Sequence, residues 1–369
     1  MLLIDEGNKD SSFNDDTSII IVVTFQRYKN MKVIEQTYFS KKIVLLNWIL
    51  TMLIVLLHGN PVIRFGLDMN TDSTIFIKLL FSACQVAVPL FFLISAILFY
   101  RTCTKFDDLK SKLRRRIKSL LIPYLLWNTL FVGIFFLLPR IPVIGEHMNM
   151  GVAVKSWIDV FWGIIDSRFT PLWFVKQLMF YTALSPLVYV VVRNKYVFTF
   201  IYILSVIVSL SIDTTIYDSF FLWLPIYLIG AFIGYHRLEI KGSRLLILMA
   251  AAILVSLYCL ILWDYYKYLT LFRIMTPALL WYLTDWIAKN IISIRFSPKK
   301  WMMHTFFIYC AHHFCLNVVI KFAVIYLEPT PWVLNVTFIS AFLIVAVGLT
   351  VFAEWFSKFR VYSILTGGR

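Results

Sequence analysis

Long runs of apolar residues alternate with short polar segments along most of the chain. Windows long enough to cross about 30 Å of hydrocarbon predict a membrane-spanning helix in each run. The predicted ranges are 43–60, 75–100, 117–138, 171–192, 196–211, 218–235, 244–262, 270–292, 304–327 and 333–357. The pattern therefore predicts an all-α polytopic membrane protein, built as a bundle of about ten transmembrane helices.

Composition supports this interpretation and separates the first residues from the rest. Apolar residues make up 60% of the 369 residues, and the mean hydropathy of +0.79 exceeds what a soluble core needs. Residues 1–16 are polar and acidic, and the apolar run 19–25 is too short to span. We expect a poorly ordered N-terminal extension at 1–40 and a transmembrane domain at 41–369. Met31 is a second candidate for the start residue.

The Lys and Arg residues predict the orientation, because 25 of the 35 fall in alternate gaps between the spans. These gaps are 27–42, 101–118, 193–195, 236–244, 289–300 and 358–369. The positive-inside rule then places both termini in the cytoplasm, as in a multi-pass protein of a plasma (inner) membrane. A net charge of +15 split among six short loops does not indicate nucleic-acid binding.

Few ionisable residues lie inside the predicted spans, and these are the candidates for chemistry. His58 closes the first span and is either an interfacial residue or a base or nucleophile in a place that excludes water. His312 lies near the midplane of the ninth span. Lys176, about a turn inside the fourth span, either snorkels outward or serves a site. Asp285 in the eighth span is placed to pair with a cation.

Eight cations fall within residues 101–118, among them Arg115, Arg116 and Lys118 at the mouth of the third span. They either anchor the loop against anionic lipid or bind a phosphate-rich cytosolic ligand, since Arg pairs bidentately with phosphate. This density exceeds what orientation requires, which favours the ligand.

The cysteines and neighbouring histidines do not indicate a metal site. The five cysteines form no disulfide framework, because four lie in apolar spans and Cys103 faces the predicted cytoplasm. Two Cys–His pairs at helical spacing, Cys310 with His313 and His312 with Cys315, lack a further ligand cluster. We predict no bound metal.

Several motifs in order resemble the acyltransferase-3 family of integral membrane O-acyltransferases. The first span ending in His58 is similar to the family pattern of a basic residue, ten positions and a histidine. The other similar segments are VAVPLFFLISAILF, RRRIKSLLIPYLLW, PLWFVKQL and TFFIYCAHHF. The chain departs at Asn47, where the family has Arg or Lys, and Lys41 or Lys42 could replace that cation. Further departures are Lys118 for Arg, Ala96 for glycine and His313 for proline.

The resemblance implies transfer of an acyl group, usually acetyl, from cytosolic acyl-CoA to a hydroxyl of a cell-envelope polysaccharide or its lipid-linked precursor. It implies no permanently bound cofactor, with acetyl-CoA as a donor substrate and membrane lipid as the surroundings. It assigns His58 to catalysis. Donor binding would fall to Arg115, Arg116, Lys118 and position Asn47, and acceptor binding or acyl relay to Trp173, Lys176, Tyr309 and His312.

Two other functions use the same features. A transporter or flippase of an anionic or glycolipid substrate would use the basic mouth and the midplane histidines for binding only. A membrane sensor that has lost catalysis would account for the departures at Asn47 and Ala96.

The predicted orientation is testable by labelling of a cysteine introduced at Arg114. A membrane-impermeant reagent added outside intact cells should leave this position unlabelled, because the 101–118 gap is predicted to be cytoplasmic. External labelling of Arg114 would overturn the whole orientation.

Overall fold

A computed structural model describes residues 38–69, 71–103, 105–137, 140–141, 156–167, 170–238, 244–287 and 297–368. The first helix covers residues 38–58 and so begins inside the predicted N-terminal extension. The rest of that extension, residues 1–37, lies outside the described residues, as do residues 288–292 of the eighth predicted span.

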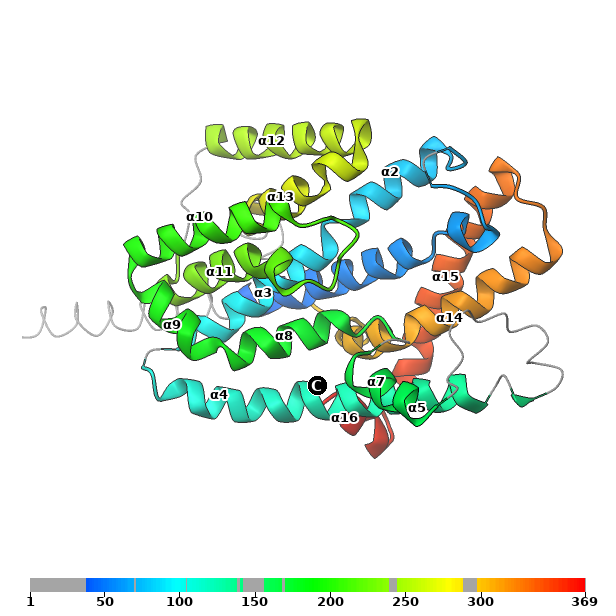
Figure 1. The fold of residues 1–369 in the computed structure, drawn as a ribbon, viewed down its shortest axis with the longest axis horizontal. Coiled ribbons are helices and arrows are strands. Elements are labelled where there is room, and N and C mark those ends of the chain that lie inside the picture. The colour runs from blue at the N-terminus through cyan, green and yellow to red at the C-terminus, as the bar shows by residue number, and fades with distance from the viewer. Residues whose placement is uncertain are drawn as a thin grey trace, which may run out of the picture.

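The described residues form a helical bundle with no strands (Figure 1). After the first helix come a short turn η1 (Val62–Phe65), α2 (Ile75–Cys84) and α3 (Ala87–Tyr100). Next along the chain are α4 (Asp108–Arg116), the π-helical segment η2 (Ile117–Leu121), α5 (Ile122–Leu137), α7 (Trp157–Ile165), α8 (Trp173–Ala183), α9 (Ser185–Arg193), α10 (Lys195–Ser211), α11 (Phe220–His236), α12 (Arg244–Trp263) and α13 (Tyr265–Ile287). The last elements are η5 (Lys300–Met303), α14 (Thr305–Tyr326), α15 (Pro331–Phe356) and α16 (Arg360–Leu365).

A helix lies within each of the ten predicted ranges, but the helices differ in length. In the part of the chain that the structure describes, six are long and apolar enough to cross a membrane, or seven if the bent pair α8 and α9 is one span. Helices α10 and α11, with 17 residues each, are shorter. The multi-pass, all-helical prediction is confirmed, whereas the count of ten spans stays a prediction.

The fourth predicted span is not one straight helix. Its two halves, α8 and α9, meet at an angle of 63° at Leu184. Pro186 lies two residues after Leu184, and a proline at this point cannot donate the next helical hydrogen bond and disfavours helical geometry in Ser185 before it. The bend therefore has a local cause in the sequence Ser185–Pro186.

Helices α3 and α11 pack against each other at very short range. A methyl group on Gly230 of α11 would lie 2.6 Å from the Leu93 carbonyl oxygen of α3, and one on Gly234 would lie 2.6 Å from the Ile97 carbonyl oxygen. The facing residue on α3 is Ala96, so the departure from the family's glycine keeps a small side chain at the contact. Such spacing of small residues lets two membrane helices approach closely.

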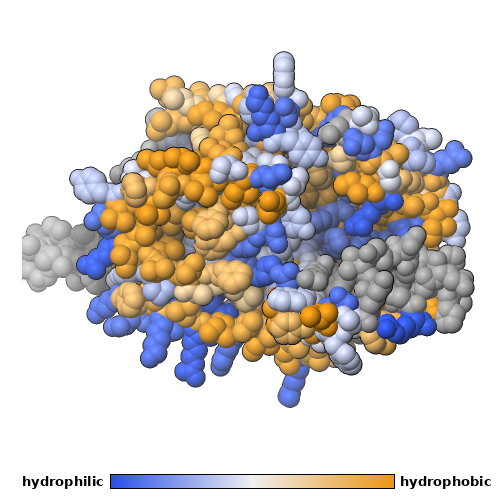
Figure 2. All heavy atoms as spheres, in the orientation of Figure 1, coloured by the Kyte–Doolittle hydropathy of each residue, from blue (hydrophilic) through white to orange (hydrophobic). Residues whose placement is uncertain are grey.

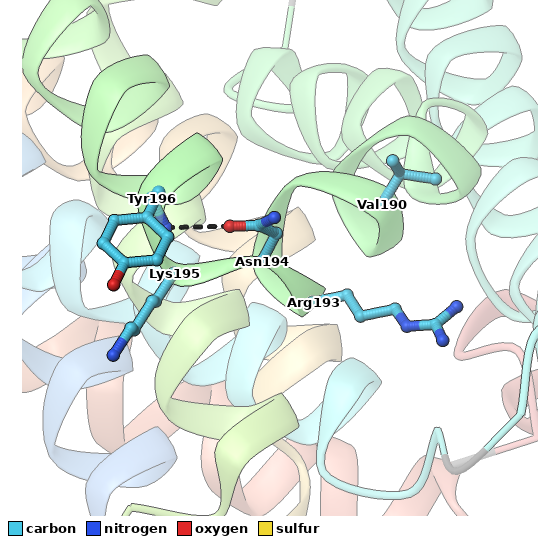
Figure 3. Close-up of a pocket in the computed structure, with 5 residues that line it drawn as sticks. All are labelled: Val190, Arg193, Asn194, Lys195 and Tyr196. Carbon is cyan, nitrogen blue, oxygen red and sulfur yellow. Dashed lines mark hydrogen bonds between the residues drawn. The ribbon is translucent and has the colours of Figure 1, made fainter.

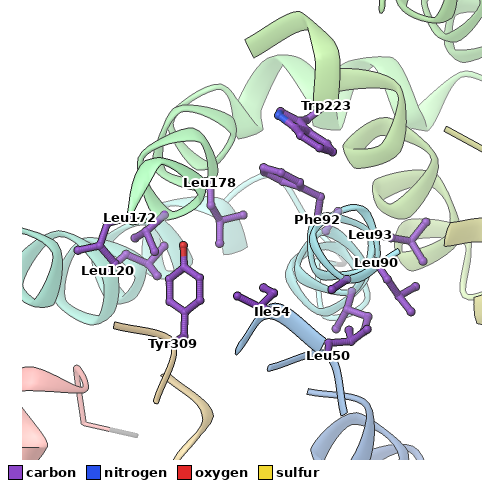
Figure 4. Packing of buried hydrophobic residues seen from close by; sticks show 14 of the residues in the cluster. Leu50, Ile54, Leu90, Phe92, Leu93, Leu120, Leu172, Leu178, Trp223 and Tyr309 are labelled. Atoms are coloured by element: carbon purple, nitrogen blue, oxygen red, sulfur yellow. The ribbon is translucent and has the colours of Figure 1, made fainter. Parts of the chain in front are cut away.

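The buried core surrounds α3. Phe92 stacks on Trp223 of α11 with ring centroids 5.3 Å apart, and Figure 4 shows Leu50 of the first helix beside Leu90 of α3. The face seen in Figure 2 carries large apolar patches. On α12, Leu245 and Leu248 are about two-thirds exposed, as expected of side chains that face lipid.

The α3–α11 contact generates a stability prediction. Gly230→Ala should lower the free energy of unfolding by about 1–3 kcal/mol, because backbone must move to admit the new methyl group. Gly133→Ala on α5 is the matched control, since nothing lies within 4 Å of a methyl group there. Thermal unfolding of the two purified variants measures the difference, and equal melting temperatures would contradict the close contact.

Candidate functional site

Three histidines from two helices meet inside the bundle. His58 is the last residue of the first helix, and its ring centroid lies 5.2 Å from that of His312 and 5.4 Å from that of His313, both on α14. The prediction that His58 and His312 belong to one site therefore agrees with their geometry. His313, which the sequence also places near the midplane of the ninth span, is a third member.

The cluster lies well below the end of the bundle. His312 is the eighth of the 22 residues of α14, so about 21 Å of helix continues beyond it. A small apolar cluster that includes Val62, Ile77, Leu334 and Phe338 packs above the end of the first helix. His58 is thus half-buried within the protein.

The hydrogen bonds of His312 fix its tautomer. Its side chain is fully buried, and Nδ1 lies 2.6 Å from the Tyr309 carbonyl oxygen. A carbonyl only accepts, so Nδ1 carries the proton and Nε2 is a bare acceptor. Among the described residues Nε2 has no hydrogen-bond partner. A buried acceptor without a partner is unfavourable and is available to take a proton from a substrate.

His313 is held from the other side by two polar residues. Arg64 Nη2 lies 3.4 Å from its Nε2, and the Asn317 side-chain amide lies 3.3 Å from its Nδ1. The guanidinium and the Asn317 amide nitrogen both donate, and a neutral imidazole accepts at only one of its two nitrogens, so these contacts do not fix the tautomer of His313. Sequence analysis did not select Arg64 or Asn317, although Arg64 follows His58 by six residues and Asn317 lies one helical turn after His313.

Tyr309 connects the histidine cluster to α8. Its hydroxyl donates to the Pro171 carbonyl, and Figure 4 shows the ring pointing from α14 toward Leu172 at the start of α8. The Tyr309 ring also lies 5.9 Å from that of His312. Tyr309 thus positions both the histidine and the helix that carries Trp173.

The other two predicted acceptor residues lie elsewhere. Trp173 packs against Tyr217 and Trp223, with ring centroids at 5.4 and 5.6 Å. Lys176 does not snorkel freely, because its Nζ lies 2.7 Å from an Asp166 carboxylate oxygen and 4.0 Å from one of Asp218. The predicted acceptor set therefore divides into Tyr309 and His312 at the cluster, and Trp173 and Lys176 beside the loops at the start of α8.

The predicted donor cations line one long helix formed by α4, η2 and α5. Arg115 and Lys118 are exposed, whereas Arg116 turns inward, with its Cζ 6.0 Å from the centre of the Phe99 ring. The π-helical segment Ile117–Leu121 begins directly after these arginines, and such segments rotate the side chains that follow and often occur at functional sites. Lys112 is not available to bind a phosphate, since its buried Nζ donates to Phe99 O and lies 2.5 Å from Thr102 Oγ1.

The cations and the histidines are well separated along the bundle. Phe131 of α5 lies at the level of the cluster, because its ring centroid is 5.9 Å from that of Phe314, next to His313. Thirteen residues separate Lys118 from Phe131, or about 20 Å of helix. The sixteen residues between Lys42 and His58 give about 24 Å on the first helix.

Lys42 does not simply replace the absent family cation. Lys42 is only 2% exposed, and its Nζ is 2.9 Å from an Asp285 carboxylate oxygen and 3.4 Å from the centre of the Trp281 ring. The prediction that Asp285 pairs with a cation is confirmed, and Lys42 is thereby engaged. Asn47 is half-buried, and its carbonyl accepts from the Thr51 hydroxyl at 2.7 Å.

A surface pocket lies at the turn between α9 and α10, lined by Val190, Arg193, Asn194, Lys195 and Tyr196 (Figure 3). The Asn194 side chain caps α10 by accepting from Tyr196 N at 2.9 Å. Arg193 and Lys195 point away from each other, so they do not form a convergent anion site. In the described ranges no group of three or more His, Cys, Asp or Glu side chains is arranged to hold a metal ion.

Comparison with known proteins identifies the family to which the chain belongs. No curated protein and no solved structure matched the sequence. The family model described as an acyltransferase domain (Acyl_transf_3) matches residues 42–355, which include the first helix, the cation run, the start of α8 and the histidines of α14. The chain is an acyltransferase that belongs to the acyltransferase-3 family.

Proposed function

We propose that this protein is an integral membrane O-acyltransferase that moves an acyl group, in the simplest case acetyl, from cytosolic acyl-CoA to a hydroxyl of a cell-envelope polysaccharide or its lipid-linked precursor. The observation that carries the proposal is the buried contact between His58 and His312, with an unpartnered Nε2 on His312. Family membership supplies the reaction class, and the site supplies the base.

The chemistry needs a group that accepts a proton and a surrounding that excludes water. The acceptor hydroxyl oxygen attacks the thioester carbonyl, so that a C–O bond forms and the C–S bond breaks. An imidazole of the cluster takes the hydroxyl proton, which then goes to the departing CoA thiolate. In the alternative route His58 first accepts the acyl group on a ring nitrogen and passes it to the hydroxyl. Histidine is suited to either role near neutral pH.

The donor phosphates are assigned to Arg115, Arg116 and Lys118. These cations lie about 20 Å along the helix from the level of the histidines, so the CoA phosphates and the reacting thioester cannot occupy the same place. The extended pantetheine arm must run along α5 toward α14, or the acyl group must be relayed. His312 lies next to His58 and is the candidate for such a relay.

Replacement of His58 tests the catalytic assignment. His58→Gln keeps a polar side chain but neither accepts a proton near pH 7 nor carries an acyl group, so transfer should fall by about 10²–10⁴-fold. The measurement is transfer of acetyl from acetyl-CoA to envelope glycan by purified, normally folded protein, together with release of free CoA.

His236→Gln is the control, because this histidine ends α11, outside the cluster, and its Nε2 contacts the Val192 carbonyl. It should retain activity. Near-parental transfer by His58→Gln would refute the catalytic role of His58. A parental protein that cleaves no thioester would instead favour the transporter.

Removal of the exposed cations tests donor binding. The double variant Arg115→Ala/Lys118→Ala should weaken acetyl-CoA binding by about 10-fold or more, because charge-assisted bonds to phosphate are lost. Lys105→Ala/Lys110→Ala, which removes two exposed cations from the same segment, should change binding little. If the two double variants bound acetyl-CoA with equal affinity, Arg115 and Lys118 would have no role in donor binding, and their charge would serve only to orient the protein in the membrane.

A further inference from the structure

Arg273 of α13 is a buried cation that the proposed reaction does not use. Its side chain is 9% exposed, and its Nη2 donates to Gln85 Oε1 at 3.0 Å. Its Nε and Nη1 are buried and have no hydrogen-bond partner among the described residues. The guanidinium carbon lies 5.3 Å from the centre of the Trp223 ring.

Among the described residues, no negative charge balances this guanidinium. The Gln85 amide and the Trp223 ring are neutral, and none of the ion pairs formed by described residues includes Arg273. By contrast, the mostly buried Lys42 and Lys176 each contact a carboxylate. A buried charge without a partner costs several kcal/mol, and a cation inside a membrane bundle is usually paired or marks a ligand path.

The surroundings of Arg273 favour an anion. Thr270 lies one turn earlier on the same face of α13, and its buried hydroxyl also has no partner in the described part of the chain. Gln85 stands in the turn between α2 and α3, two residues before α3 begins. The same residue caps the C-terminus of α2, whose partial negative charge opposes the partial positive charge of the α3 N-terminus. The preference for an anion therefore comes from the unused donors of Arg273 and Thr270.

We propose that Arg273 binds an oxyanion of the acceptor substrate, either the carboxylate of an acidic sugar or the phosphate of a lipid-linked glycan. The planar guanidinium matches both groups bidentately. Arg273 lies twelve residues, or about 18 Å, along α13 from Asp285, toward the end of the bundle away from the Lys42–Asp285 pair. The inference rests on the proposed function only where it identifies the ligand as the acceptor substrate, because the unbalanced charge of Arg273 is observed whatever the protein does.

The test is ligand-induced stabilisation of the purified full chain without donor. The carboxylate probe is glucuronate, and neutral methyl glucoside is its control. The phosphate probe is decyl phosphate, and neutral decyl maltoside is its control. One anionic probe should raise the melting temperature of the parent by about 2 °C or more, whereas its neutral counterpart should not. The responding probe distinguishes an acidic sugar from a lipid phosphate.

Two variants and a control locate the effect. Arg273→Met should abolish the anion response while melting no lower than the parent, because removal of an unbalanced buried charge relieves its cost. Arg273→Lys keeps the charge but loses the fork, so its response should be reduced. Lys267→Met removes an exposed cation from the same helix and should respond like the parent.

The inference is overturned if neither anionic probe stabilises the parent or if Arg273→Met responds as the parent does. A merely structural arginine would instead lower the melting temperature when replaced and show no anion response. Acetyl transfer is measured separately. An anion response in a protein without transfer would refute the proposed function alone, and transfer without an anion response would refute this inference alone.

Discussion

The fold depends on satisfying polar groups in an apolar bundle. At membrane depth no bulk water pairs with a buried donor, acceptor or charge, so each must find a partner within the protein. Lys42 contacts Asp285, Lys112 donates to carbonyl and hydroxyl oxygens at the end of α3, and Tyr309 donates to the Pro171 carbonyl. The first and last of these contacts join segments far apart in sequence: Lys42–Asp285 joins the first helix to α13, and Tyr309–Pro171 joins α14 to the start of α8.

The exceptions to this rule are the most informative positions. Ten buried side-chain atoms of the described residues have no partner, and three of them belong to His312 (Nε2) and Arg273 (Nε and Nη1). Unsatisfied buried groups are costly, and a substrate that supplied the missing partner would remove this cost. The His312 atom is a bare acceptor suited to receiving a hydroxyl proton, and the Arg273 atoms are donors suited to an anion. Under the proposed function, these are the two roles needed to activate and to bind an acceptor.

Sequence patterns predicted the helical class and placed a helix in each of the ten predicted ranges, because a membrane requires long apolar segments. They also selected His58 and His312, since ionisable residues are scarce in such segments. The meeting of these residues could not be derived from spacing, because 254 residues separate them. The depth of His58 was likewise hidden, because only the folded chain brings the end of the first helix beside His312, about 21 Å short of the end of α14. The bend at Leu184 has a visible cause in Pro186, but its angle depends on packing.

For Lys42, the role expected from the sequence differs from the contact found in the structure. A cation near the start of the first helix is a plausible substitute for the basic residue that the family places eleven positions before His58. Its carboxylate partner is on α13, which only the folded chain brings near. Position 47 thus remains the neutral Asn47. Arg115 and Lys118 of the α4–η2 segment are exposed, and Lys118 lies about 20 Å along the helix from the level of the histidines. Under the proposed function, the acyl group, and not the CoA phosphates, must therefore enter the bundle to reach His58.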